Sequence, residues 1–224
     1  MGEDGKRAAG RAAAELVEGG MRLGLGTGST VAHFLEALAE RDLDVAGVPT
    51  SESTATRCRE LGIAVLPPDE VHDLDLTVDG ADELERALNL TKGGGGALLR
   101  EKVVAWNSRR VVVIATPDKV VDRLADSFPL PVEVVVFAEA SVRRALEALG
   151  FEVRVRDGGD YRTDDGNLVL DARADGGIED PARMEMILAM IPGIAESGLF
   201  VDLCDVALLG HDDGTVQTLE PVAD

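Results

Sequence analysis

The first half of the chain alternates short apolar runs with segments in which apolar residues recur every three or four positions. The short runs predict strands and the periodic segments predict helices. The predicted strands are residues 22–25, 45–48, 63–66, 74–78 and 110–115, and the predicted helices are 6–18, 31–38, 54–61 and one that begins near 97. Strands that alternate with helices form parallel βα units. The pattern therefore predicts an α/β domain with a Rossmann-like parallel sheet and helices on both faces.

The pattern changes after Phe128-Pro-Leu-Pro131. From there it predicts, in order, strand 132–137, helix 141–149, strands 151–156 and 167–172, helix 181–190 and strand 194–201. This βαββαβ order is typical of a smaller, ferredoxin-like α+β domain. Two last strands, 206–209 and 216–219, predict a hairpin that we expect to return to the first domain. The predicted domains are therefore 1–130 together with 203–224, and 131–202.

Charge narrows the classes of partner. Asp and Glu number 42 against 22 Lys and Arg, which gives a formal net charge of −20. A field of that sign repels nucleic acid and anionic membranes, so we expect neither as a partner. The chain holds four lysines and 18 arginines. This bias favours adaptation to a salt-rich cytoplasm over an ordinary soluble acidic protein.

The chain has the features of a cytoplasmic protein. Cys58 and Cys204 are too few and too far apart for a disulfide framework or a Cys-x-x-Cys metal site. We expect no signal peptide, since the first residues lack an apolar run, and no stretch reaches the ~18 apolar residues of a membrane span. The histidines share no metal-ligand spacing. Ser51, Ser53 and Thr54 are explained by capping of the next helix.

The first candidate motif is the loop Gly24-Leu-Gly-Thr-Gly-Ser-Thr30, between a predicted strand and a helix. Glycines let the backbone approach an anion, and the helix N-terminus supplies N–H groups. A dinucleotide fingerprint would need glycine where Ser29 stands, and a P-loop would need a lysine that the motif lacks. A bound monophosphate is favoured over a nucleotide. The alternative is a tight turn capped by Ser29 or Thr30.

The second motif is Asp79-Gly-Ala-Asp-Glu83, directly after a strand. Its carboxylates could accept hydrogen bonds from sugar hydroxyls or hold a cationic partner. One alternative is an Asx-turn with a helix N-cap. A hard-metal site is the other, although no further His, Asp or Glu stands at a complementary spacing.

The third motif is Lys92-Gly-Gly-Gly-Gly-Ala97, followed by Glu101. Four consecutive glycines are costly to order, so a fold keeps them where the backbone must approach a ligand or adopt positive φ. Lys92 adds a point charge. Glu101 falls one helical turn after Ala97, which aims it back toward the glycines as a general base. The alternative is an ordinary solvated helical glutamate.

Taken together, the ordered motifs resemble the ribose-5-phosphate isomerase type A family over nearly the whole chain. The matching strings are Gly24–Thr30, Asp79–Glu83, Lys92–Gly95, Leu99-Arg-Glu-Lys102 and Phe128-Pro-Leu-Pro-Val-Glu-Val134. The resemblance implies a substrate pocket lined by Thr27, Gly28, Ser29, Thr30, Asp79, Gly80, Ala81, Asp82, Lys92, Gly93, Gly94 and Gly95. It places the proton acceptor on Glu101 and a further binding lysine on Lys119. A fourth glycine, Gly96, departs from the family pattern.

The resemblance also implies a function. It predicts interconversion of ribose 5-phosphate and ribulose 5-phosphate in the non-oxidative pentose phosphate pathway, without metal or cofactor, by a homodimer or homotetramer. Glu101 would move a proton between C2 and C1 through an enediolate, with Lys92, Asp79 and Asp82 assisting. A non-catalytic sugar-phosphate sensor is the main alternative. A nucleotide-dependent oxidoreductase is disfavoured by the failed fingerprint.

Overall fold

The computed structural model describes residues 2–221 and divides the chain into two compact units. The larger unit holds residues up to 81, 100–119 and those from 203 on, and the smaller holds 82–99 and 120–202. Segments 82–99 and 120–130 thus group with the smaller unit, whereas the sequence interpretation assigned them to the larger domain.

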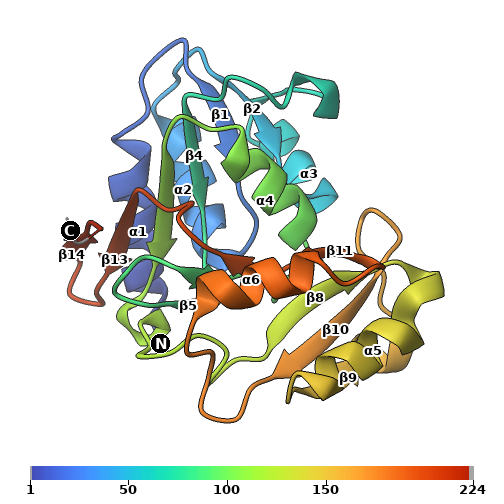
Figure 1. Cartoon of the computed structure of the whole chain (residues 1–224). Coiled ribbons are helices and arrows are strands. Elements are labelled where there is room, and N and C mark those ends of the chain that lie inside the picture. Colours follow the sequence, from blue (N-terminus) through green and yellow to red (C-terminus); the bar gives the residue numbers. More distant parts are fainter. Residues whose placement is uncertain (1, 222–224) are drawn as a thin grey trace. The chain divides into compact units, whose positions relative to one another are not determined.

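The larger unit is built on one seven-stranded sheet (Figure 1). Its strands, in the order β14-β13-β7-β4-β1-β2-β3, are Val216–Leu219, Val206–Gly210, Val111–Ala115, Leu76–Asp79, Arg22–Leu25, Ala46–Pro49 and Ala64–Val65. All neighbours pair in parallel except β14, which is antiparallel to β13. The Rossmann-like prediction is confirmed, and the terminal hairpin joins this sheet through β13 and β7 as expected.

Helices cover both faces of this sheet. They are α1 (Glu3–Ala14), α2 (Ser29–Glu40), α3 (Glu52–Glu60) and α4 (Leu98–Trp106), with short 3-10 turns η1 (Pro68–Glu70) and η2 (Pro117–Lys119). Along β1, Leu23 and Leu25 join the apolar core with α1 and α2. Gly24 points the other way, where an added Cβ would lie 2.5 Å from Val104 Cγ1 of α4. A glycine at this position therefore lets α4 pack closely on the sheet.

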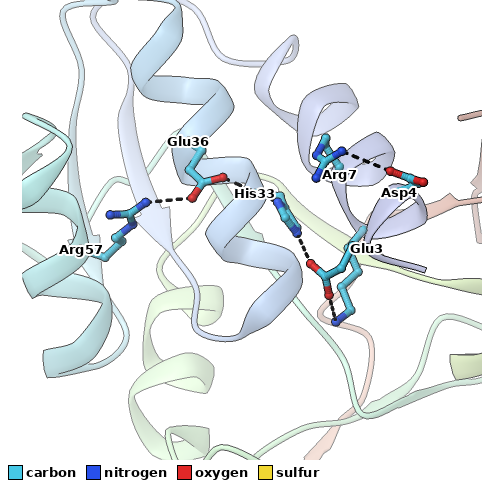
Figure 2. A network of polar contacts seen from close by, with 7 residues as sticks. Glu3, Asp4, Arg7, His33, Glu36 and Arg57 are labelled. Carbon is cyan, nitrogen blue, oxygen red and sulfur yellow. Dashed lines mark hydrogen bonds and ion pairs between the residues drawn. The ribbon is translucent and has the colours of Figure 1, made fainter. Parts of the chain in front are cut away.

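A chain of polar contacts links α1, α2 and α3 on the surface (Figure 2). His33 Nε2 lies 2.9 Å from Glu3 Oε2, and its Nδ1 lies 3.7 Å from Glu36 Oε2. Glu36 continues the chain to Arg57 at 2.8 Å. The His33 side chain is 15% exposed and lies between carboxylates of α1 and α2, so its contacts join these two helices.

The smaller unit contains a four-stranded sheet in the order β11-β8-β10-β9, with every neighbouring pair antiparallel (Figure 1). In chain order its elements are β8 (Leu130–Val134), η3 (Val136–Ala138), α5 (Glu139–Ala148), β9 (Glu152–Val155), η4 (Arg156–Gly159), β10 (Leu168–Arg173), α6 (Pro181–Ala189) and β11 (Ile194–Ser197). This is the predicted βαββαβ unit. Both helices contribute to the apolar core on one face of the sheet, with Val132 and Leu170.

The other face of this sheet carries charged side chains. Side chains alternate between faces along a strand, so Pro131 and Glu133 of β8 and Asp171 of β10 share the face that α5 and α6 leave uncovered. The backbone of the glycine loop lies against it, since an added Cβ on Gly93 would lie 3.2 Å from Pro131 Cβ.

A three-stranded sheet in the smaller unit was not predicted. It pairs β12 (Leu199–Phe200), β6 (Leu90–Thr91) and β5 (Glu83–Leu84). The predicted strand 194–201 is wrong as a single element, because it breaks at Gly198 and contributes β11 to one sheet and β12 to the other. Gly198 donates to Pro131 O and accepts from Lys92 N, and an added Cβ would lie 2.3 Å from Lys92 O. Only glycine fits where the chain passes between the two sheets.

Within residues 2–221, none of the helices combines the length and the apolar character needed to cross a bilayer.

Candidate active site

Three predicted segments lie at one edge of the larger sheet. Gly26–Thr30 follows β1, Asp79 ends β4 and leads into Gly80 and Ala81, and the turn that ends at Lys119 follows β7. These strands are direct neighbours and run parallel. Their carboxyl ends therefore share one edge, where ligands bind in open α/β sheets.

Asp79 fixes the first glycine loop. Its side chain is buried, and its Oδ1 accepts hydrogen bonds from Thr27 N at 3.1 Å and Gly80 N at 2.7 Å. An added Cβ on Gly26 would lie 2.1 Å from this oxygen. The chain runs on into β5 rather than a helix, so the alternative of a helix N-cap is wrong for Asp79.

The Thr27 hydroxyl lies at the centre of a hydroxyl cluster that the sequence did not reveal. Its Oγ1 lies 2.7 Å from Thr50 Oγ1, 2.8 Å from Ser51 Oγ and 3.0 Å from Thr54 Oγ1. Ser51 also caps α3 by accepting from Thr54 N at 3.1 Å, as predicted. The capping prediction was therefore correct but incomplete, because the second partner of Ser51 is Thr27 in the loop after β1, 24 residues away in sequence.

The N-terminus of α2 carries no side-chain cap. Its N-cap is Gly28, with φ 123° and ψ 174°, so the alternative of a turn capped by Ser29 or Thr30 is wrong. The first turn of α2 holds no acidic residue. Gly28 and Ser29 are exposed. A helix start of this kind presents backbone N–H groups and a positive dipole end to an anion.

Glu101 lies on the buried face of α4 and is only 5% exposed, together with the buried Leu98, Val104 and Ala105. Val103 and Trp106 occupy the exposed face. The alternative of a solvated helical glutamate is therefore wrong. Charged side chains are rarely buried without a reason, and burial of this carboxylate in the first turn of α4 is compatible with a functional role.

In the smaller unit, Asp82 binds the second glycine loop. Its backbone N–H donates to Thr91 O at 2.8 Å, and its Oδ2 accepts from Gly94 N at 2.7 Å. Lys92 is buried, its backbone N–H donates to Gly198 O, and its Nζ lies 5.5 Å from the Phe200 ring centroid. The loop is thus held at its beginning by the hydrogen bond from Lys92 to Gly198, next to the three-stranded sheet. It is held at its middle by the hydrogen bond from Gly94 to the Asp82 carboxylate.

Each glycine of this loop has a different steric environment. Gly93 and Gly96 have φ of +99° and +80°. An added Cβ on Gly94 would lie 2.5 Å from Asp82 Oδ1, and one on Gly96 would lie 1.8 Å from Tyr161 Oη. At Gly95 it would meet nothing within 4 Å. Gly93 and Gly96 are therefore required by the fold itself, a side chain at Gly94 would have to displace the Asp82 carboxylate, and Gly95 borders open space.

Two buried carboxylates of the smaller unit were not predicted as functional. Glu83 accepts hydrogen bonds from Ala125 N, Ser127 N, Ser127 Oγ and Phe128 N, at 2.6 to 2.9 Å. It thereby ties the Asp79–Glu83 motif to the turn before the Phe128-Pro-Leu-Pro motif. The sequence showed both motifs, but nothing local indicated that one side chain joins them across 42 to 45 residues.

The second carboxylate is Glu133, whose Oε1 accepts from Thr163 Oγ1 at 2.8 Å and Asn167 Nδ2 at 2.9 Å. Burial raises the pKa of this carboxyl, and hydrogen bonds from Asn167, Thr163 and the Leu99 backbone partly oppose that effect. Leu99 is the second residue of α4. Glu133 therefore holds the first turn of the helix that carries Glu101.

The predicted site residues are divided between the two units. The larger holds Thr27, Gly28, Ser29, Thr30, Asp79, Gly80, Ala81, Glu101 and Lys119, and the smaller holds Asp82, Lys92, Gly93, Gly94 and Gly95. The structure brings Thr27 to Asp79 in the first group and Gly94 to Asp82 in the second. Among residues 2–221, no three His, Cys, Asp or Glu side chains gather in a group suited to a metal ion.

Comparisons with known proteins agree with the motifs. The family described as ribose 5-phosphate isomerase A (phosphoriboisomerase A) matches residues 46–214. Ribose-5-phosphate isomerase A of Caulobacter sp. (strain K31) is 50% identical over 222 residues, which cover 96% of this chain and 97% of the relative.

Solved structures give the same result. The ribose 5-phosphate isomerase A from Methanocaldococcus jannaschii has a TM-score of 0.92 at 39% identity and covers 98% of this chain and 100% of its own. A D-ribose-5-phosphate isomerase in complex with phospho-erythronic acid has a TM-score of 0.93 at 36% identity, with coverage of 98% and 100%.

Gly95→Ala and Gly96→Ala should differ in stability. Gly95→Ala should change the free energy of unfolding by less than about 0.5 kcal/mol, because its Cβ enters open space. Gly96→Ala should lose about 1–3 kcal/mol, since it combines positive φ with a clash against Tyr161. Urea denaturation of both variants measures this, and equal losses would contradict the loop geometry.

Glu133→Gln should alter how stability depends on pH. The folded chain favours the protonated carboxyl, so wild-type stability should fall as pH rises from the ordinary value of 4.5 through the raised pKa. The amide does not titrate, so the variant should gain stability relative to wild type between pH 5 and pH 7.5. Denaturant melts at the two pH values test this, and a constant difference would show that the pKa is not raised.

Proposed function

The chain belongs to the ribose 5-phosphate isomerase A family and interconverts ribose 5-phosphate and ribulose 5-phosphate, and we propose that Glu101 is the base of this reaction. The observation that carries the assignment of Glu101 is its burial in the first turn of α4, directly after the glycine loop. A general base must be held in place and shielded from bulk water to transfer a proton between carbons.

The reaction moves one hydrogen between neighbouring carbons without net oxidation. In the open-chain aldehyde, the Glu101 carboxylate takes the proton from C2, and the electron pair of that bond forms the C1–C2 double bond of an enediolate. The protonated Glu101 then returns the proton to C1. The C2 hydroxyl gives up its proton as the ketone forms, and the C1 oxygen becomes a hydroxyl.

The charge that develops on oxygen in the enediolate needs a positive partner that is already in position. Lys92 and the N–H groups of the glycine loop are the groups we assign to this role. Lys92 is buried, which strengthens its interaction with a developing anion relative to the same charge in water. Asp79 and Asp82 would orient sugar hydroxyls and assist ring opening.

We assign the phosphate to the loop at the start of α2. The support is the uncapped helix N-terminus at Gly28, its exposed neighbour Ser29, and the lack of acid in the first turn. Thr30 and Lys119 would add a hydroxyl and a charge. The relative solved with phospho-erythronic acid supports a phosphorylated sugar chain as the ligand class.

The sensor and oxidoreductase alternatives find no support among these relatives, which are named as isomerases along nearly their full length. We further propose that the chain acts as a cytoplasmic homodimer or homotetramer. Exposed apolar side chains on the smaller unit, Phe137 at 99% and Met190 at 81%, support an interface there. The net charge of −20 with four lysines supports function in high salt.

Glu101→Gln should lower kcat by about 10²–10⁴-fold, because an amide cannot accept the C2 proton. Binding of phospho-erythronic acid should persist. The matched control is Glu15→Gln, an exposed glutamate at the end of α1, which should keep wild-type kcat. NMR in D2O follows both ketose formation and deuterium incorporation, and exchange retained by Glu101→Gln would remove this residue from the role.

A further inference from the structure

The carbonyl side of the Lys92–Gly96 loop is held by two side chains from one segment of the smaller unit. Arg156 Nη1 donates to Gly93 O at 3.0 Å and to Gly94 O at 3.1 Å. The Tyr161 hydroxyl donates to Gly95 O at 3.1 Å. The carbonyl groups of three consecutive glycines, which have no side chains, are thus fixed from one direction.

We propose that Arg156 is a positioning residue of the isomerase, which orients the glycine-loop peptides so that the Gly95 N–H faces the developing oxyanion of the enediolate. This proposal rests on the proposed function. Arg156 does not touch the substrate in this role. It acts through the loop backbone.

Peptide geometry connects the carbonyls to the amides. A trans peptide is planar, so the N–H of one residue points opposite to the carbonyl of the residue before it. With Gly93 O turned to Arg156, the Gly94 N–H faces away, where Asp82 Oδ2 accepts it at 2.7 Å. With Gly94 O turned to Arg156, the Gly95 N–H also faces away from the arginine. Gly95 is the loop residue that borders open space.

Arg156 is itself held in a fixed orientation. Its Nε and Nη2 donate to the two carboxylate oxygens of Asp171, at 3.1 and 2.5 Å. The guanidinium lies 5.5 Å from the Tyr161 ring centroid. The arginine and aspartate side chains are only 13% and 21% exposed. A planar guanidinium can make both sets of hydrogen bonds at once, whereas a lysine ammonium lacks that geometry.

The charge arrangement also suits an anionic intermediate. Asp171 neutralises Arg156, so the pair holds the loop without adding net negative charge beside it. Burial raises the pKa of the Tyr161 hydroxyl, which keeps it protonated as a donor to Gly95 O. The loop therefore keeps its donors oriented over the neutral pH range.

Arg154 provides a matched control. It lies in β9, two residues before Arg156, pairs with Glu152 at 2.7 Å and is 81% exposed. Arg154→Met makes the same change of side chain and charge in the same segment, at a residue whose ion pair is with Glu152 and not with the glycine loop. It should keep kcat and KM within about twofold, as surface changes usually do.

The test compares Arg156→Met, Arg156→Lys and Arg154→Met by steady-state kinetics on ribose 5-phosphate and by inhibition with phospho-erythronic acid. The planar carboxylate of this compound resembles the planar enediolate. Arg156→Met should lower kcat by about 10- to 100-fold with KM changed by less than about threefold, as expected for a misplaced donor. The inhibition constant should rise in parallel with the loss of kcat/KM. Arg156→Lys should recover only part of the activity.

Melting temperatures identify a variant that fails to fold. If Arg156→Met does not fold, the double variant Arg156→Met/Asp171→Leu is tested in its place. Removing both charges leaves no buried ion without a partner. The proposal is overturned if the folded Arg156 variant keeps wild-type kcat, or if its kcat falls while the inhibition constant stays unchanged. It is also overturned if Arg154→Met loses as much kcat as Arg156→Met. A wild-type chain inactive on ribose 5-phosphate would instead overturn the proposed function before any variant is compared.

Discussion

The glycine loop at Lys92–Gly96 is held from two opposite sides, and the proposed stabilisation of the enediolate depends on that constraint. Asp82 accepts the Gly94 N–H on one side, and Arg156 and Tyr161 donate to three carbonyls on the other. Four glycines in sequence are flexible in isolation and costly to order. The side chains around the loop supply the rigidity that its own residues lack, and rigid N–H donors stabilise an oxyanion without reorganising during the reaction.

A second set of residues contacts the backbone or side chains of the segments that hold the motif residues. Glu83 holds the turn 125–128, Glu133 holds the start of α4, and Asp171 holds Arg156. Each is a buried or half-buried carboxylate that accepts several hydrogen bonds. Buried polar groups need such partners, and a fully satisfied network specifies one backbone arrangement. The motif residues can therefore be glycines and residues with small side chains, because hydrogen bonds from these supporting side chains fix their backbone.

Much of the fold could be predicted because the information is local. The run Val111–Ala115 and the βαββαβ order after Pro131 follow from periodicity, and the structure has both the predicted parallel sheet and the predicted βαββαβ unit. The break at Gly198 could not be predicted, since the reason is the close approach of Lys92 O, a residue more than 100 positions earlier. The same holds for Arg156, Glu83 and the cluster around Thr27, whose partners lie far away in sequence. The motifs identified the residues proposed to touch the substrate. The residues that hold them in place could be identified only from contacts in the folded chain.

A crystal structure of the chain with phospho-erythronic acid bound tests the central claim most directly. If the fixed loop presents its amide to the oxyanion, a carboxylate oxygen of the ligand should lie about 2.7–3.2 Å from the Gly95 nitrogen, with the Arg156 hydrogen bonds to the loop intact. A ligand whose carboxylate contacts no N–H of residues 93–96, or a loop released from Arg156 when the ligand binds, would contradict it.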